Sequence, residues 1–114
     1  MGVTFKANTD DMRDSSSLSM IPALVKKGAK IKYYDPTGFK KEFSKTKNVS
    51  YIDNIRDSVK GSDLVIIHTE WNDFKSINFR NLVKGKKFII YDMRNIYSPS
   101  KIINQGFKYY CIGR

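Results

Sequence analysis

Segments typical of β-strands alternate with segments typical of α-helices along this 114-residue chain. The strand-type segments are residues 2–5, 30–34, 49–52, 64–67, 88–91 and 107–112. The helix-type segments are residues 16–27, 54–60, 74–83 and 98–105. A helix returns the chain to the start of the next parallel strand, so this alternation is typical of a mainly parallel sheet. The sequence therefore predicts a three-layer α/β domain with a Rossmann-like arrangement.

Local signals refine these segments. Leu18, Ile21, Leu24 and Val25 recur at three- and four-residue spacing, which predicts one apolar face on helix 16–27. Serines 15–17 are predicted to cap the start of this helix, and Gly28 is predicted to end it. Pro22 predicts a kink, or a position close to the first helical turn.

Three further signals lie in the middle of the chain. Asp53 is the predicted cap of helix 54–60, and Gly61 its predicted end. Residues 37–47 are polar and basic, which predicts a loop or a short helix. The unbroken aliphatic run 64–67 predicts a central parallel strand that is buried on both faces.

The composition is that of a basic, water-soluble domain with a formal net charge of +10. No apolar run approaches the roughly 20 residues that a membrane span needs, so we expect no membrane partner. The single cysteine, Cys111, allows no internal disulfide and fits a reducing compartment, which predicts a cytoplasmic protein. The lysines indicate either a solvated basic surface or attraction to anionic ligands or nucleic acid. They include Lys26, Lys27, Lys30, Lys32, Lys40, Lys41, Lys45, Lys47, Lys84, Lys86 and Lys87.

In an open parallel sheet, ligands bind beyond the carboxyl ends of the strands. Polar and aromatic side chains follow four of the predicted strands, in residues 6–13, 34–36, 68–71 and 92–95. We therefore expect the ligand-binding residues among these four segments.

The loop after the first predicted strand has an unusual chemistry. Gly2 is its only glycine, so it lacks the glycine-rich turn that lets backbone approach a dinucleotide pyrophosphate. It carries instead two cations, Lys6 and Arg13, which can bind phosphate or carboxylate groups. These cations favour an anionic, hydroxyl-rich ligand such as a nucleotide sugar. The alternative is that Arg13 only pairs with one of the acidic residues near it in sequence, Asp10, Asp11 or Asp14.

Other candidate side chains favour structural roles. His68 is the only histidine, which predicts no metal site, and its position favours capping or packing over acid–base catalysis. Trp71 is expected to pack under the following loop, or else to stack beside a base. Asp35 is followed by proline and favours a turn over a ribose contact. Cys111 is expected to be a small buried apolar residue.

Several motifs resemble one known family. The segment GVTFKANTDDMRDSSSLSMIPALVKKGA at residues 2–29 resembles the start of the C-terminal domain of UDP-glucose 6-dehydrogenases. These enzymes are members of the UDP-glucose/GDP-mannose dehydrogenase family. The segments YYDP (33–36), HTEW (68–71) and MRNIYSP (93–99), and the ending GFKYYCIGR (106–114), match this family in the same order.

The resemblance implies a function for the whole chain. Members of this family bind NAD in an N-terminal domain and the nucleotide sugar in a C-terminal domain, and they oxidise the C6 hydroxyl to a carboxylate. Residues 1–114 would then be the UDP-sugar-binding domain of an enzyme that converts UDP-glucose to UDP-glucuronate, in the service of polysaccharide biosynthesis. The resemblance implies that Phe5, Lys6 and Arg94 contact the substrate and that Arg13 reaches NAD held by the other domain.

Two departures from the family pattern have consequences. The family has glycine where this chain has Met93, so the sequence leaves the orientation of Arg94 open. The segment that carries the family's catalytic thiol, and the glycine-rich NAD loop, are not found in residues 1–114. We therefore assign no catalytic residue to this chain and expect it to be inactive alone, as a fragment whose first strand is truncated.

Two alternative functions are consistent with the same residues. The chain can be a non-catalytic module, from a split or truncated gene, that binds a nucleotide sugar or docks onto a separately encoded N-terminal half. A basic nucleic-acid-binding domain is the weakest alternative, because the sequence shows no recognition motif and no clustered basic face.

Overall fold

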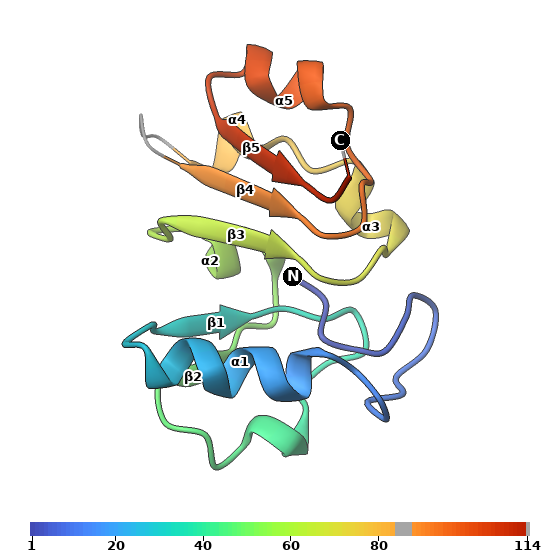
Figure 1. The fold of residues 1–114 in the computed structure, drawn as a ribbon, viewed down its shortest axis with the longest axis vertical. Coiled ribbons are helices and arrows are strands. Elements are labelled where there is room, and N and C mark those ends of the chain that lie inside the picture. The colour runs from blue at the N-terminus through green and yellow to red at the C-terminus, as the bar shows by residue number, and fades with distance from the viewer. Residues whose placement is uncertain (84–87, 114) are drawn as a thin grey trace.

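The computed structural model describes residues 1–83 and 88–113, and it confirms the predicted α/β class (Figure 1). The helices are α1 (Ser17–Lys26), α2 (Ile55–Val59), α3 (Asn72–Lys75), α4 (Phe79–Leu82) and α5 (Pro99–Asn104), with a 3-10 turn η1 (Lys41–Phe43). The strands are β1 (Ile31–Tyr33), β2 (Val49–Tyr51), β3 (Leu64–Ile67), β4 (Ile89–Asp92) and β5 (Lys108–Cys111). Lys84, Lys86 and Lys87 lie outside the described residues.

The strands form two parallel sheets. One sheet pairs β1 with β2, with Ile31 opposite Val49. The other has the order β3-β4-β5, and Val65, Ile90 and Tyr109 lie in one row across it. The amino end of the chain enters between β1 and β3 (Figure 1).

The predicted first strand, residues 2–5, is wrong. Only Met1 and Gly2 pair with neighbouring strands: the Met1 amino group donates to Ile66 O, and the Gly2 N–H donates to Tyr34 O. The next two N–H groups, of Val3 and Thr4, donate instead to the Asp35 carboxylate. Because this side chain takes the donors that a strand would use, the chain leaves the sheet after Gly2.

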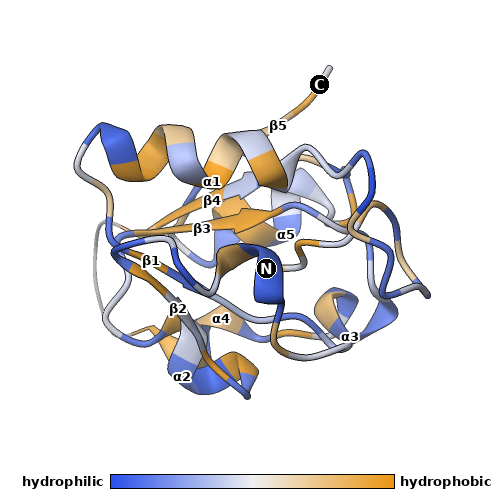
Figure 2. Ribbon diagram, turned by 90° about the horizontal axis from the view of Figure 1, so that it is seen from below, coloured by the Kyte–Doolittle hydropathy of each residue, from blue (hydrophilic) through white to orange (hydrophobic). Residues whose placement is uncertain are grey.

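Each sheet has its own hydrophobic core. The larger core packs side chains of α2, α3, α4 and α5, including Val59, Phe74, Phe79 and Ile102, against one face of the β3-β4-β5 sheet. The smaller core joins Val3, Met12, Ile21, Tyr33 and Phe43 around α1 and β1. Figure 2 shows the hydrophobic colouring concentrated on β3 and β4.

The prediction that β3 is buried on both faces is also wrong. Leu64 has 43% of its surface exposed, whereas Val65 and Ile67 on the alternate face are buried. Tyr91 and Tyr110 lie on the same exposed face, with their rings stacked 6.5 Å apart. This face exposes apolar surface because the core helices pack on the opposite side.

Helix α1 lies close to its predicted range and ends at the predicted place. Gly28 has φ of 100°, and its N–H donates to Val25 O. The predicted apolar face is only partly correct, because Leu18 is exposed whereas Ile21 is buried. Ser16 precedes the helix without capping it through its side chain. Pro22 lies within the helix.

Two other helix predictions need correction. The segment predicted as one helix, 74–83, forms two short helices, because the Asn78 side chain accepts from Arg80 N–H and starts α4 anew. The cap of α2 is Asn54 rather than Asp53: the Asn54 side chain accepts from Asp57 N–H at 2.8 Å.

The described lysines are not all free surface charges. Lys32 Nζ donates to the carbonyls of Asp57 and Lys60, at the carboxyl end of α2, where a positive charge is favourable. Lys40 has only 6% of its surface exposed, and its Nζ donates to Thr37 Oγ1. Both side chains therefore contribute to the fold.

Candidate functional site

The loop after Gly2 is held in place by buried polar side chains. Val3 O accepts hydrogen bonds from Ser15 Oγ and Ser17 Oγ, each at 2.6 Å. One Asp35 oxygen accepts from Val3 N–H at 2.8 Å, and the other accepts from Thr37 N–H and Thr37 Oγ1. The loop that carries Phe5 and Lys6 is therefore anchored at its start to the end of β1 and to α1.

Asp35 has a structural role rather than a binding role, as the proline after it led us to expect. The side chain is 1% exposed, and both of its oxygens accept hydrogen bonds from protein donors. A ribose hydroxyl would have to displace one of these donors. The serines that anchor Val3 had been expected to cap α1. They lie far from Val3 in the sequence, so no local pattern indicated this contact.

The structure brings Phe5 and Arg94 together at the carboxyl edge of the strands. Arg94 Nε donates to His68 O at 2.8 Å, and its outer nitrogen lies 3.5 Å from Phe5 O. The Phe5 ring has 44% of its surface exposed. Arg94 thus contacts the backbone of Phe5; an exposed aromatic ring can stack on a base or sugar, and a guanidinium can bind phosphate.

Asp92 determines the path of the turn that carries Arg94. One of its oxygens accepts from Arg94 N–H, and the other accepts from Tyr97 N–H and Tyr109 Oη. Asp92 is fully buried, and the sequence gave it no role beyond its place at a strand end. A carboxylate directly after the predicted strand 88–91 was the signal that could have identified it.

Met93 does not disturb this turn. Its N–H donates to Ile67 O, and the residue with a positive φ is Asn95, at 55°. Asparagine tolerates that conformation better than most residues. The turn therefore forms without glycine at position 93, and Arg94 points toward the end of β3.

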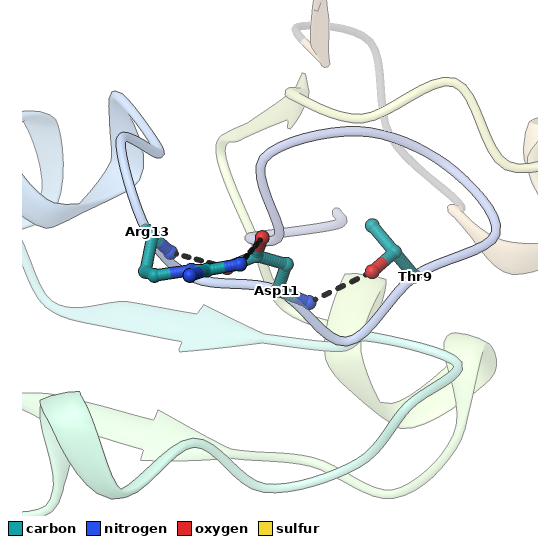
Figure 3. A network of polar contacts seen from close by, with 3 residues as sticks. All are labelled: Thr9, Asp11 and Arg13. Carbon is teal, nitrogen blue, oxygen red and sulfur yellow. Dashed lines mark hydrogen bonds and ion pairs between the residues drawn. The ribbon is translucent and has the colours of Figure 1, made fainter.

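Arg13 is paired with Asp11 (Figure 3). Arg13 Nε and its outer nitrogen each lie 3.1 Å from an Asp11 oxygen, and Asp11 N–H donates to Thr9 Oγ1 at 3.2 Å. Pairing with a nearby acidic residue was the alternative that the sequence left open for Arg13. The Arg13 side chain is nevertheless 88% exposed, so it remains accessible to a ligand.

Lys6 acts on the same carboxylate as Arg13. The hydrogen bonds from Arg13 hold the pKa of Asp11 below its usual value, and the positive charge of Lys6 adds to this effect. The charges of both cations of the loop therefore act on one acidic side chain.

His68 is buried and hydrogen-bonded on both ring nitrogens. Nε2 lies 2.7 Å from Ser16 Oγ, and Nδ1 lies 3.1 Å from Thr69 Oγ1. Burial lowers the pKa of His68 to about 4, and the positive charges of the amino terminus and Arg94 add to the shift. The ring is therefore neutral at pH 7 and supports the loop, as packing histidines do.

Two further candidates lie in or against the larger sheet. Trp71 packs partly buried against the larger core, and its Nε1 has no hydrogen-bond partner within the described residues. Cys111 ends β5 and is half-buried, rather than fully buried as expected. Within residues 1–83 and 88–113, no three His, Cys, Asp or Glu side chains are grouped as metal ligands would be.

Residues 1–99 match the UDP binding domain of the UDP-glucose/GDP-mannose dehydrogenase family. The chain belongs to this family. The match includes Phe5, Lys6, Arg13 and Arg94, and it confirms the resemblance carried by the sequence motifs.

Curated relatives agree with this assignment. The chain is 38% identical to a UDP-glucose 6-dehydrogenase of Rhizobium meliloti, over all of this chain and 26% of the relative. It is 35% identical to a UDP-glucose 6-dehydrogenase of Rickettsia felis, over 99% of this chain and 26% of the relative. The chain therefore spans about a quarter of the length of these relatives.

Solved structures share the fold. An NDP-N-acetyl-D-galactosaminuronic acid dehydrogenase from Methanosarcina mazei aligns with a TM-score of 0.84 at 24% identity, over 99% of this chain and 23% of that one. A UDP-D-ManNAc dehydrogenase from Pyrococcus horikoshii aligns with a TM-score of 0.72 at 30% identity, over 99% of this chain and 24% of that one.

The loop after Gly2 differs from the glycine-rich turn of the usual dinucleotide-binding site. The loop after Gly2 carries side chains where a dinucleotide cradle needs bare backbone. Gly2 itself faces Thr69 and Phe74, since a Cβ on it would lie 2.6 Å from Thr69 Cβ. Among the described residues, every helix is too short or too polar to cross a bilayer.

Proposed function

We propose that this chain is the nucleotide-sugar-binding part of an NAD-dependent UDP-glucose 6-dehydrogenase. In this proposal Phe5, Lys6 and Arg94 contact the UDP-sugar, and Arg13 reaches NAD that a separate N-terminal domain holds. The observation that carries it is the meeting of Phe5 and Arg94 at the strand ends, in a chain whose family domain is described as UDP binding. The reducing cytoplasm is the proposed location.

The chemistry of this edge suits a sugar diphosphate. Arg94 is oriented by His68 O, so its guanidinium can bind a phosphate with little loss of side-chain freedom. Lys6 supplies a second positive charge, and Phe5 an exposed aromatic surface. The role proposed for these three side chains is binding and orientation of the substrate.

Calorimetry with UDP-glucose tests the binding part of the proposal. We expect binding to the 114-residue chain, and a loss of about tenfold in affinity for Lys6→Ala or Arg94→Gln, the size of one charge-assisted hydrogen bond. The matched controls are Lys101→Ala on α5 and Arg80→Gln on α4, which remove the same exposed charges elsewhere. Equal losses in the control and test variants would show a general charge effect and contradict the site.

A second measurement separates catalysis from binding. The chain alone is expected to reduce no NAD in the presence of UDP-glucose, because it supplies neither the family's thiol segment nor a dinucleotide cradle. Formation of NADH by the pure chain would overturn this expectation. UDP-glucose binding without turnover, even after addition of an N-terminal dehydrogenase half, would favour the alternative of a non-catalytic binding module.

A further inference from the structure

The end of strand β3 lies between the two groups of side chains that the proposed UDP-sugar site uses. On one side, His68 O accepts from Arg94 Nε at 2.8 Å. On the other side, Thr69 Oγ1 donates to Thr4 O at 3.1 Å, directly before Phe5 in the first loop. Both His68 and Thr69 are buried. These two residues therefore join the turn of Arg94 to the first loop.

Thr4 determines where the first loop leaves the core. The residue is fully buried, and its N–H lies 3.4 Å from an Asp35 oxygen. Its own hydroxyl donates to Lys6 O at 3.0 Å, so the Thr4 side chain also holds the turn that follows. The next carbonyl, of Phe5, lies 3.5 Å from the outer nitrogen of Arg94. A shift of Thr4 would therefore move Phe5 and Lys6 relative to Arg94.

The direction of each hydrogen bond at Thr69 follows from its single hydroxyl proton. A carbonyl can only accept, so Thr69 gives this proton to Thr4 O. Thr69 Oγ1 also lies 3.1 Å from His68 Nδ1, and it must accept in that contact. Burial lowers the pKa of His68, so the ring is neutral at pH 7 and carries one proton. That proton is therefore on Nδ1, and Nε2 accepts from Ser16 Oγ at 2.7 Å.

These contacts form a chain of hydrogen bonds that all point the same way. The chain begins at Ser16, before α1, and passes through the His68 ring. It ends with the Thr69 hydroxyl and the Thr4 carbonyl. The Thr69 side chain also packs closely against Gly2, where a Cβ would lie 2.8 Å from Thr69 Oγ1. Binding side chains keep a precise geometry only when such supporting contacts hold the backbone that carries them.

We propose that Thr69 is a positioning residue of the UDP-sugar site. Its hydroxyl holds the loop of Phe5 and Lys6 at a fixed position relative to Arg94. The Nδ1 proton of His68 orients that hydroxyl. Thr69 is fully buried, so its effect reaches the ligand only through the loop. The inference rests on the proposed function for its effect on binding, but the hydrogen-bond network that carries it can be tested without a ligand.

Calorimetry with UDP-glucose on the 114-residue chain tests the effect on binding. Thr69→Val keeps the shape of the side chain without the hydroxyl, and it should weaken binding about tenfold. Thr69→Ser keeps the hydroxyl and should bind within about twofold of the wild type. Gly106→Ala is the control for stability alone, because Gly106 has φ of 90° and lies before β5, at the opposite end of the strands. This control should unfold more easily and bind as the wild type does.

Two results of the titration would overturn the proposal, once circular dichroism has shown that the variants are folded at the temperature used. One is wild-type affinity in Thr69→Val, since a purely structural threonine would change stability alone. The other is an equal loss in Thr69→Ser, which would show that the hydroxyl is not responsible.

A double variant tests whether Thr69 acts through the loop. Thr69→Val combined with Lys6→Ala should lose less affinity than the product of the two separate losses, because a displaced loop no longer places the Lys6 charge correctly. Losses that multiply in full would contradict an action through the loop.

The ring nitrogens of His68 separate this inference from the proposed function. Proton–nitrogen correlation spectra show which nitrogen carries the proton, and His68 is the only histidine of the chain. We expect the proton on Nδ1 at pH 7. A proton on Nε2 would overturn the inference, because Thr69 would then donate to Nδ1 rather than to Thr4 O. A wild-type chain with the Nδ1 proton that binds no UDP-glucose at millimolar concentration would contradict the proposed function and leave the network intact.

Discussion

At the scale of single residues, buried carboxylates organise the edge where ligands are expected. Asp35 holds the start of the first loop, and Asp92 holds the turn before Arg94. Both side chains accept hydrogen bonds from backbone N–H groups that no strand or helix satisfies. Such contacts make a polar loop stable enough to position binding side chains, because buried donors without partners are costly.

Replacing Gly2 tests how closely the start of the chain packs against Thr69. It has φ of 75°, and a Cβ there would lie 2.6 Å from Thr69 Cβ. Gly2→Ala is expected to lower the free energy of unfolding by about 3 kcal/mol, from backbone strain and overpacking together. Gly38→Ala is the control, because Gly38 has φ of 93° with open space around it and should cost about 1 kcal/mol. Equal costs in urea unfolding would contradict the contact with Thr69.

At the scale of elements, the sequence predicted most helices and strands but not their ends. The aliphatic run 64–67 and the helix between the predicted cap Asp53 and Gly61 were readable because their signals are local. The break between α3 and α4 at Asn78 could not be predicted from the sequence. A side-chain cap in the middle of an apolar pattern looks like any exposed polar residue. The choice between Asp53 and Asn54 as cap depends on backbone angles that neighbouring residue types do not determine.

The cap of α2 can be checked by mutation. Asn54→Ala removes the acceptor for Asp57 N–H and is expected to cost about 1 kcal/mol of unfolding free energy. Asp53→Ala should cost less than about 0.5 kcal/mol, because Asp53 is exposed and does not cap the helix. Chemical denaturation of the two variants measures the difference. A larger loss for Asp53→Ala would restore the sequence-based assignment.

At the scale of the whole molecule, two small parallel sheets are joined through the first two residues. Three backbone hydrogen bonds of Met1 and Gly2 bridge β1 and β3. The stability of the whole therefore depends on a buried amino group, and on His68 next to it. Both groups are bases whose charged forms are disfavoured by burial.

This arrangement predicts a pH-dependent stability. The amino-terminal pKa falls from 8.0 to about 5 in the folded chain, and that of His68 falls from 6.5 to about 4. Between these limits the unfolded chain binds more protons, so the unfolding free energy should decrease as pH falls from 8 to 4. Urea midpoints across this range measure the effect. An amino-terminally acetylated chain should lose the dependence between pH 6.5 and 8, and a wild-type midpoint that is constant there would contradict the burial of the amino group.

The sequence by itself determined the α/β class, the family and the segments that follow each strand, because periodicity and motifs are properties of neighbouring residues. The tertiary structure decided which side chains meet: Arg94 with the carbonyls of His68 and Phe5, Arg13 with Asp11, and Asp35 with the loop after Gly2. It also divided the predicted sheet in two. Apart from the local pair of Arg13 and Asp11, these contacts join residues far apart in the chain, and only the packing of the elements brings them within hydrogen-bonding distance.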